Sequence, residues 1–178
     1  REYLNDPLHL AMIMVACDDA DGVIAGASTP SSEVIRTAIR IVGIKSSSRW
    51  VSSIFFLISP EGDNAYTFAD CAVIPEPDSK QLAVIGRDSA EFHQLLTGDD
   101  PSVAFLSFST KGSASHYRID RVQEGVKIFG SQYSNIAYDG ELQVDAAIIP
   151  GISQIKAPES PLEGRANVLI FPNLDAGN

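Results

Sequence analysis

Short apolar runs alternate with amphipathic segments along this chain of 178 residues, and no other feature constrains its fold as strongly. The apolar runs, which predict strands, lie at 21–27, 50–59, 65–70, 102–108 and 166–172. The segments with apolar residues at helical spacing, which predict helices, lie at 31–43, 79–98, 116–130 and 141–149. Strands alternating with helices predict an α/β fold, a sheet flanked by helices. The turn at 60–64 predicts a hairpin, which makes the sheet mixed.

The chain opens with a predicted helix, with Asp6 as N-cap and Pro7 in the first helical position. The apolar run at 10–17 is much shorter than the roughly 20 residues that span a membrane, so a core helix is expected. Near the other end, residues 157–164 are expected to form an exposed connector rich in proline and glycine.

Charge and cysteine content narrow the classes of function. The chain has 23 acidic and 13 basic residues, a net charge of −10, which argues against non-specific binding to nucleic acid. An acidic protein can still hold an anionic small molecule in a local cationic pocket. Cys17 and Cys71 stand far apart without metal-type spacing, so a reducing, cytosolic compartment is expected.

One strand leads into a loop of hydroxyl groups. The apolar run that ends at Phe108 is followed by Ser109, Thr110, Lys111, Gly112 and Ser113, and a helix is predicted soon after. Ligands of α/β folds collect at the carboxyl ends of strands, and backbone N–H groups at a helix start bind anions. The loop is therefore a candidate phosphate site. The alternative is that its serines and threonine only cap and turn the chain.

A second loop is built in the same way. Residues 22–36 run from a predicted strand into a predicted helix and include Ser28, Ser31 and Arg36. Residues 34–60 contain four basic residues and no acidic one, a local excess of cations in an acidic chain. Two such loops predict a ligand with more than one anionic group, whereas the alternative is that these cations only solvate a helix face.

Other chemically capable residues have ordinary structural explanations. His9, His93 and His116 make no metal spacing and are expected at the surface. Cys71 is either a nucleophile or a small buried hydrophobe. Glu141 and Asp145 are candidates for acid–base chemistry, or acids placed at the start of a helix for its dipole.

Five motifs together resemble the phosphate acetyltransferases, members of the phosphate acetyl/butyryltransferase family. They are ADGVIAGA, FADCAVIPEP, VAFLSFSTKGSA, DGELQVDAAI and KAPESPLEGRANVLIFPNLDAGN, in the order of the family and over nearly the whole chain. The resemblance implies a fold similar to isocitrate and isopropylmalate dehydrogenases, with two α/β domains and a cleft between them. Residues 1–48 would then be the remnant of the first domain, 49–165 the second, and 166–178 a strand returning toward the first.

The resemblance also implies an activity, the reversible transfer of an acetyl group between coenzyme A and inorganic phosphate. Acetyl-CoA, CoA, phosphate and acetyl phosphate would be its partners, with coenzyme A as a substrate and no metal or other cofactor. The protein would be a cytoplasmic homodimer of acetate metabolism that binds neither nucleic acid nor membrane.

Site residues carry over from the family in part. Arg36 matches the arginine expected to hold the anionic substrate, and it is the predicted catalytic residue. Ser28, Ser31, Ser109, Thr110, Lys111, Gly112 and Ser113 are predicted to bind substrate, with Cys71 near the site. Thr29 and Thr37 depart from the His and Pro that are usual in the family.

The family's Ser-Arg-Gly motif and the Asp that follows it do not occur in these 178 residues, so we expect this piece by itself to be nearly inactive. Three alternatives remain open: a phosphate butyryltransferase, a regulatory domain that binds acetyl-CoA as in some malic enzymes, and a purely structural dimerisation domain.

Overall fold

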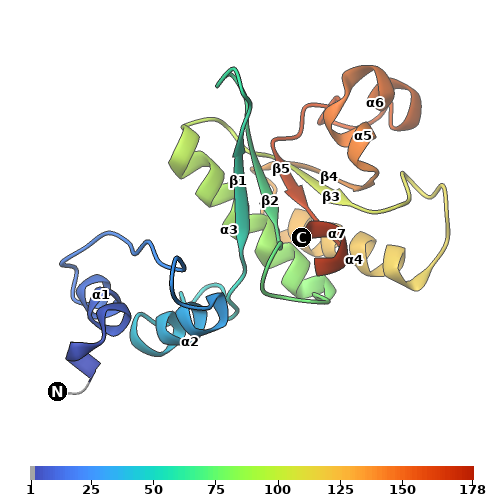
Figure 1. Ribbon diagram of the computed structural model, residues 1–178. Helices are drawn as coiled ribbons and strands as arrows, with labels where there is room; N and C mark the ends of the chain where they lie inside the picture. The colour runs from blue at the N-terminus through green and yellow to red at the C-terminus, as the bar shows by residue number, and fades with distance from the viewer. Residues whose placement is uncertain (1–2) are drawn as a thin grey trace. The chain divides into compact units, whose positions relative to one another are not determined.

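The computed structural model describes residues 3–178, and the chain divides into two compact units, Arg1–Arg49 and Trp50–Asn178 (Figure 1). The first unit contains a short 3₁₀ turn, Tyr3–Asn5, and two helices, α1 (Pro7–Ala16) and α2 (Ser31–Ile41). As predicted, Asp6 caps α1, with its Oδ1 accepting the Leu8 N–H at 2.8 Å. Gly43 ends α2 with φ at +91°, and its N–H donates to the Ala38 carbonyl at 3.1 Å.

Two predictions for the first unit are wrong. The strand expected at 21–27 does not form, and Ile24 is fully exposed. A strand exists only where a neighbour completes its hydrogen-bond ladder, and no described residue pairs with this segment. Helix α1 is also not a core helix, because Leu10 and Met14 are exposed and only Leu8 and Met12 are buried.

The second unit is built on a five-stranded mixed sheet, which confirms the predicted α/β class. Its strands are β1 (Ile54–Ile58), β2 (Ala65–Ala69), β3 (Ser102–Leu106), β4 (Ala137–Leu142) and β5 (Val168–Ile170), in the order β1-β2-β5-β3-β4. The hairpin β1–β2 is antiparallel, as predicted, and the other pairs are parallel. Strand β5 is the middle strand of this sheet and therefore belongs to the second unit. The expectation that residues 166–178 return toward a first domain stays a prediction.

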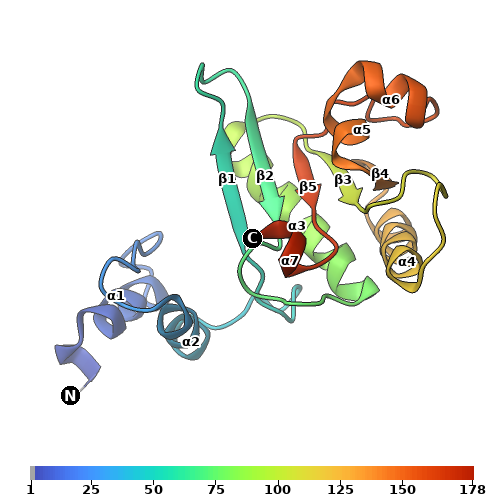
Figure 2. The same ribbon diagram turned by 45° about the vertical axis from the view of Figure 1, so that its right-hand side comes forward.

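Helices cover both faces of this sheet (Figures 1 and 2). Helices α3 (Ser79–Thr97) and α4 (Tyr117–Gln132) cover one face, α5 (Val144–Ile148) and α6 (Pro150–Lys156) lie on the other, and α7 (Leu174–Gly177) follows β5. Alternate residues of β3 supply the two cores. Phe105 packs with α3 and α4, whereas Leu106 packs on the side of α5, as the period of two in a strand requires.

Two further predictions need correction here. The helix expected at 141–149 is a strand up to Leu142 and a helix only over 144–148, because Leu142 pairs with Leu106 of β3. Glu141 and Asp145 therefore do not share a helix start. The connector at 157–164 is not simply exposed, since it buries the side chains of Ala157, Ser160 and Leu162.

The close approach of α3 to the sheet depends on Gly86. A Cβ atom at this position would stand 2.8 Å from Cζ of Phe105 and 3.1 Å from Cε2 of Phe129, two fully buried rings. Neither ring has free space to move into, so a methyl group here would overpack the core.

We therefore expect Gly86→Ala to lower the free energy of unfolding by about 1–3 kcal/mol in urea titrations. Gly151→Ala on α6 is the control, because nothing lies within 4 Å of its added Cβ. Equal stability of the two variants would show that α3 has room to shift.

His93 on α3 is buried, so the expectation of a surface histidine is wrong for this residue. Its Nδ1 lies 3.0 Å from Oγ1 of Thr67, and its Nε2 is buried without a partner among the described residues. Burial lowers the pKa of His93 below its usual value of 6.5, because the charged ring cannot be solvated there.

The unfolded chain therefore takes up a proton before folded His93 does, and stability should fall as the pH drops below about 6.5. We expect His93→Gln to reduce the difference in unfolding free energy between pH 7.5 and pH 5.5. An unchanged pH dependence in the His93 variant would contradict the assignment.

Candidate functional site

The carboxyl ends of four parallel strands meet at one edge of the sheet, where ligands of α/β folds bind. The loop predicted as a phosphate site lies at this edge, between β3 and α4. Its five predicted residues, Ser109 to Ser113, follow one another there. Ser109 and Thr110 are buried, and Lys111, Gly112 and Ser113 are exposed.

A buried carboxylate shapes this loop from inside. Glu141, 2% exposed near the end of β4, accepts three hydrogen bonds. Its Oε1 accepts the Gly112 N–H at 2.7 Å and the Ser109 hydroxyl at 3.0 Å, and its Oε2 accepts the Gln123 amide of α4 at 2.9 Å. Glu141 thus joins β4, the loop and α4.

These hydrogen bonds decide the charge of Glu141. Burial raises the pKa of its carboxyl, but the Gly112 N–H, the Gln123 amide and the Ser109 hydroxyl more than offset that effect. The pKa therefore lies below its usual value of 4.5, and the group is an anion at neutral pH. A fixed buried anion is a structural acceptor rather than a general acid.

The remaining hydroxyls of the loop also have partners within the protein. Thr110 Oγ1 donates to Oε1 of Gln143 at 3.3 Å and accepts the Gln143 N–H at 2.9 Å. Ser113 Oγ accepts the Thr110 N–H at 3.0 Å and lies 3.3 Å from Ser109 Oγ. The ammonium of Lys111 pairs with Asp139. The inner donors of the loop are therefore already occupied.

Asp70, just after β2, holds its own loop in the same manner. Its Oδ1 accepts the N–H groups of Ala72 at 2.9 Å and Val73 at 3.0 Å, and its Oδ2 accepts that of Ile74 at 3.0 Å. The neighbouring Cys71 is fully buried. Burial and the charge of Asp70 raise the pKa of its thiol to about 11, so it is not a nucleophilic thiolate at neutral pH.

The other predicted residues belong to the first unit. Ser28 lies in an exposed bend, Ser31 begins α2, and Arg36 is exposed on that helix. Among the described residues, Arg36 has no ion pair or hydrogen bond. Its guanidinium can therefore accept an anionic partner.

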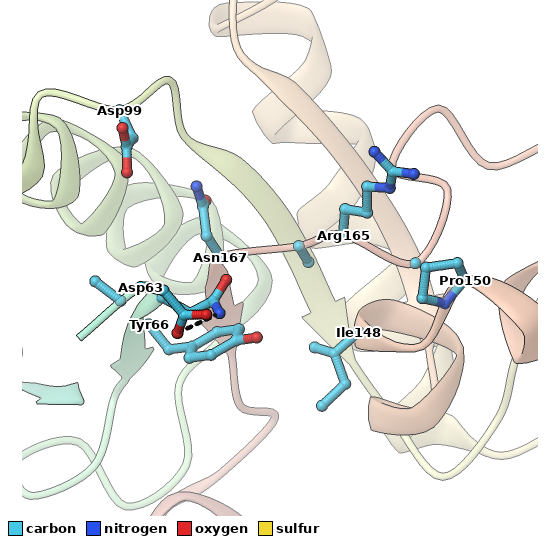
Figure 3. A pocket seen from close by; sticks show the side chains of 11 residues that line it. Asp63, Tyr66, Asp99, Ile148, Pro150, Arg165 and Asn167 are labelled. Atoms are coloured by element: carbon cyan, nitrogen blue, oxygen red, sulfur yellow. Dashed lines mark hydrogen bonds between the residues drawn. The ribbon is translucent and has the colours of Figure 1, made fainter. Parts of the chain in front are cut away.

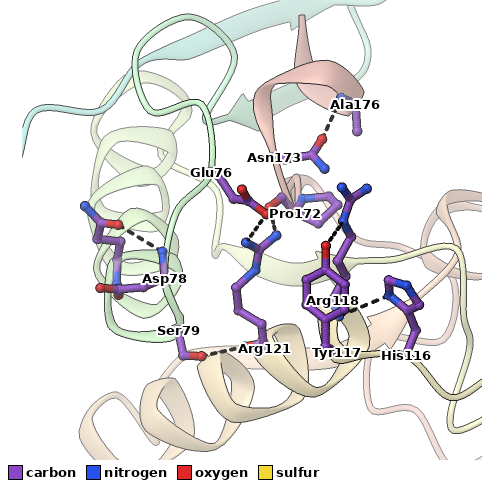
Figure 4. A network of polar contacts seen from close by, with 11 residues as sticks. Glu76, Asp78, Ser79, His116, Tyr117, Arg118, Arg121, Pro172, Asn173 and Ala176 are labelled. Atoms are coloured by element: carbon purple, nitrogen blue, oxygen red, sulfur yellow. Dashed lines mark hydrogen bonds and ion pairs between the residues drawn. The ribbon is translucent and has the colours of Figure 1, made fainter.

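A cavity of about 310 Å³ opens at the carboxyl ends of β3 and β5. We name it the Arg118 pocket; its lining includes Ser107, Phe108, Arg118, Val144, Phe171 and Asn173. Two arginines of α4 stand nearby, and Figure 4 shows how they differ. The Arg121 guanidinium donates to Glu76 at 2.8 Å and to the Pro172 carbonyl at 3.0 Å. The Arg118 guanidinium has no hydrogen-bond partner among residues 3–178 other than the Tyr117 hydroxyl.

A polar cavity of about 340 Å³ lies at the opposite edge, before β2 and β5 (Figure 3). Its lining includes Asp63, Asp99, Arg165 and Asn167. The amino ends of parallel strands are not the usual place for a ligand, so this cavity is the weaker candidate.

Sequence reasoning does not single out Arg118, and it finds Glu141 without its structural role. The sequence presents Glu141 either as a candidate for acid–base chemistry or as an acid at a helix start, whereas in the structure it is a buried acceptor within a strand. The sequence presents Arg118 only as part of an amphipathic helix. A signal for Arg118 exists in the sequence, because HYR combines a cation with two aromatic rings immediately after the hydroxyl loop. The burial of Glu141 depends on the pairing of β4 with β3 and leaves no local signal.

The described residues contain no group of three or more His, Cys, Asp or Glu side chains that could hold a metal ion. His116 caps α4, its Nδ1 accepting the Arg118 N–H at 3.3 Å, and Nδ1 of His9 lies 2.9 Å from Asp6. None of the helices within residues 3–178 is long and apolar enough to cross a membrane.

Comparison with known proteins identifies relatives along the whole chain. The profile of a family described as phosphate acetyl/butaryl transferase matches residues 1–178. The phosphate acetyltransferase of Thermoanaerobacterium thermosaccharolyticum is 43% identical over 100% of this chain and 56% of its own length.

Solved structures agree with this result. The EutD phosphotransacetylase from Staphylococcus aureus superposes with a TM-score of 0.89 at 43% identity, over 99% of this chain and 54% of its own. A phosphotransacetylase from Streptococcus pyogenes gives a TM-score of 0.90 at 36% identity, over the same shares. The chain thus spans about half the length of the relatives it matches.

Replacing Glu141 tests its structural role. We expect Glu141→Gln to lower the free energy of unfolding at pH 7 by about 2–3 kcal/mol, because an amide cannot accept from all three donors. The lowered pKa also predicts that wild-type stability falls as the pH drops through and below 4.5, and the variant should lose this part of the pH dependence. Urea titrations at several pH values measure both effects.

Glu124→Gln is the matched control, since its side chain is 56% exposed. It should unfold like the wild type. A Glu141 variant as stable as this control would show that the loop does not need the carboxylate.

Proposed function

Because the chain belongs to the phosphate acetyl/butaryl transferase family, we propose that the whole protein transfers an acetyl group reversibly between coenzyme A and inorganic phosphate. The observation that carries the proposal is the match of this family over residues 1–178, together with phosphate acetyltransferases that are 43% identical to the chain. The location of the Arg118 pocket and the hydroxyl loop at the carboxyl edge of the sheet is consistent with it.

The reaction needs positive charge and hydrogen-bond donors. A phosphate oxygen attacks the thioester carbonyl, the C–O bond forms, the C–S bond breaks, and the departing thiolate takes up a proton. Negative charge develops on the carbonyl oxygen in between, and both substrates are anions from the start. Preorganised cations and N–H groups lower such a barrier, and holding both substrates together removes much of its entropic cost.

Arg36 is the residue proposed to meet this charge. It is exposed, has no ion pair among the described residues, and lies in a stretch with four basic and no acidic residues. Ser28 and Ser31 are proposed to assist it as hydroxyl donors. On the second unit, the exposed residues Lys111, Gly112 and Ser113 are proposed to face substrate, while Ser109 and Thr110 hold the loop in shape.

Three wider features also belong to the proposal. The whole protein is proposed to be a homodimer, to work in the cytoplasm and to serve acetate metabolism. Its binding partners would be acetyl-CoA, CoA, phosphate and acetyl phosphate, with no resident cofactor. Comparing turnover of acetyl-CoA and butyryl-CoA by the whole protein separates acetyl transfer from butyryl transfer.

Arg36→Ala in the whole protein should lower kcat/KM about 100-fold, equivalent to about 2.7 kcal/mol of transition-state stabilisation. Arg40→Ala is the control, because it removes the same charge from the same exposed face of α2 one turn further on. The release of CoA thiol from acetyl-CoA and phosphate measures both rates. Equal rates for the two variants would contradict a catalytic role for Arg36, and no thiol release by the wild type would contradict the function itself.

A further inference from the structure

The Arg118 pocket combines apolar walls with one cation. Val144, Phe171 and Pro172 line it on one side and Phe108 on another, whereas its polar groups are Ser107, Arg118 and Asn173. A small inorganic anion would leave these apolar walls uncovered. A ligand that fills the pocket must therefore carry both an apolar or aromatic part and a negative charge.

Arg118 is the cation that lines this pocket. It is exposed, its Nε donates to the Tyr117 hydroxyl at 3.2 Å, and its terminal nitrogens have no partner among the described residues. Lys111 and Arg121, by contrast, are paired with Asp139 and Glu76. The fork of a guanidinium matches the geometry of a phosphate group.

Aromatic side chains form the rim beside this arginine. The Phe108 and His116 rings lie 5.9 Å apart, and the His116 and Tyr117 rings 4.5 Å. Phe108 and Tyr117 are 58% and 62% exposed, although rings of this size are usually covered. Exposed aromatic faces next to a cation are the features with which proteins stack nucleotide bases.

Two donors at the mouth of the pocket also have no partner of their own. The Ser107 oxygen accepts the Ser109 N–H at 3.2 Å, but the Ser107 hydroxyl proton is not donated to any described residue. The Phe108 N–H has no acceptor among the described residues either. In the neighbouring loop, by contrast, the donors of Ser109, Gly112 and Thr110 already donate to Glu141 or Gln143.

We infer that the Arg118 pocket binds the nucleotide end of coenzyme A, with the adenine on the Phe108–Tyr117 rim and a phosphate group on Arg118. This inference rests on the proposed function, which makes coenzyme A a substrate. The apolar walls take the uncharged arm that leads from the nucleotide toward the thioester. Ser107 and the Phe108 N–H supply hydrogen bonds at the mouth.

Acidic residues near Arg118 increase the loss of ligand affinity that we expect when this arginine is removed. The carboxylates whose charges act on it include Glu76 and Asp175, and Glu76 is already paired with Arg121. Without Arg118, these two acids would repel a phosphate at the rim. Its removal should therefore weaken binding by more than the loss of one contact.

The test measures binding rather than turnover. Adenosine 3′,5′-bisphosphate and coenzyme A are titrated into the chain by calorimetry, with wild type, Arg118→Ala and Lys127→Ala compared at one salt concentration. We expect at least a tenfold weaker affinity for both ligands in the Arg118 variant. Lys127→Ala should bind like the wild type, because it removes the same charge from a 75% exposed position further along α4. Ser107→Ala should weaken binding by a few-fold.

Each outcome has one meaning. Wild-type affinity in the Arg118 variant, or no binding of either ligand to the wild-type chain, overturns the inference even if the whole protein is an active transferase. Binding that depends on Arg118, in a whole protein that releases no thiol from acetyl-CoA, supports the inference and contradicts the proposed function. Equal losses in the Arg118 and Lys127 variants would reflect net charge alone and would also overturn it.

Discussion

The burial of a carboxylate at the end of a strand is the constraint on which this carboxyl edge depends. Lys111 and Gly112 both have positive φ angles, +49° and +79°, a conformation that costs a non-glycine residue roughly 1–2 kcal/mol. The loop adopts it because Glu141 accepts the Gly112 N–H at 2.7 Å. A hydrogen bond to a charged acceptor contributes about 1.5–3 kcal/mol, enough to offset the strain. The Ser113 N–H, which donates to the Thr110 carbonyl at 3.1 Å, adds to the same turn.

Carboxylates that hold loops by accepting their hydrogen bonds also reduce the number of donors left for a ligand. Glu141 and Asp70 both lie where strands end. Between them they accept hydrogen bonds from four backbone N–H groups, two serine hydroxyls and one side-chain amide. These donors would otherwise be available to an anionic ligand. They also place two negative charges beneath the edge where such a ligand would lie. The hydrogen bonds that hold these loops rigid therefore leave fewer N–H and hydroxyl groups to bind an anion. The attraction for an anionic ligand has to come from cationic side chains instead.

Whether the sequence could predict an element depends on how far apart along the chain the residues that stabilise it lie. Helices α3 and α4 and the hairpin are specified by local signals, periodicity and a turn, and all were predicted. The strand expected at 21–27 does not form, and the helix expected at 141–149 forms only over 144–148, because a short apolar segment becomes a strand only where another strand pairs with it. The hydroxyl loop was placed correctly at a strand end. The occupation of its donors could not be foreseen, since Glu141 and Gln143 stand about thirty residues away in the sequence.

The two units differ in how their charged residues are distributed and paired. At the carboxyl edge of the second unit, Lys111 and Arg121 are paired with acids, and Arg118 stands beside an aromatic rim suited to a nucleotide. A transfer between two anionic substrates needs additional positive charge at the reacting atoms. Arg36 of the first unit has no ion pair among residues 3–178, and it lies in a stretch free of acidic residues. At the carboxyl edge of the second unit, the paired cations and the buried carboxylates fix the loops. Under the proposed function, Arg118 and Arg36, one on each unit and both without an ion pair among the described residues, are groups that could attract anionic substrates.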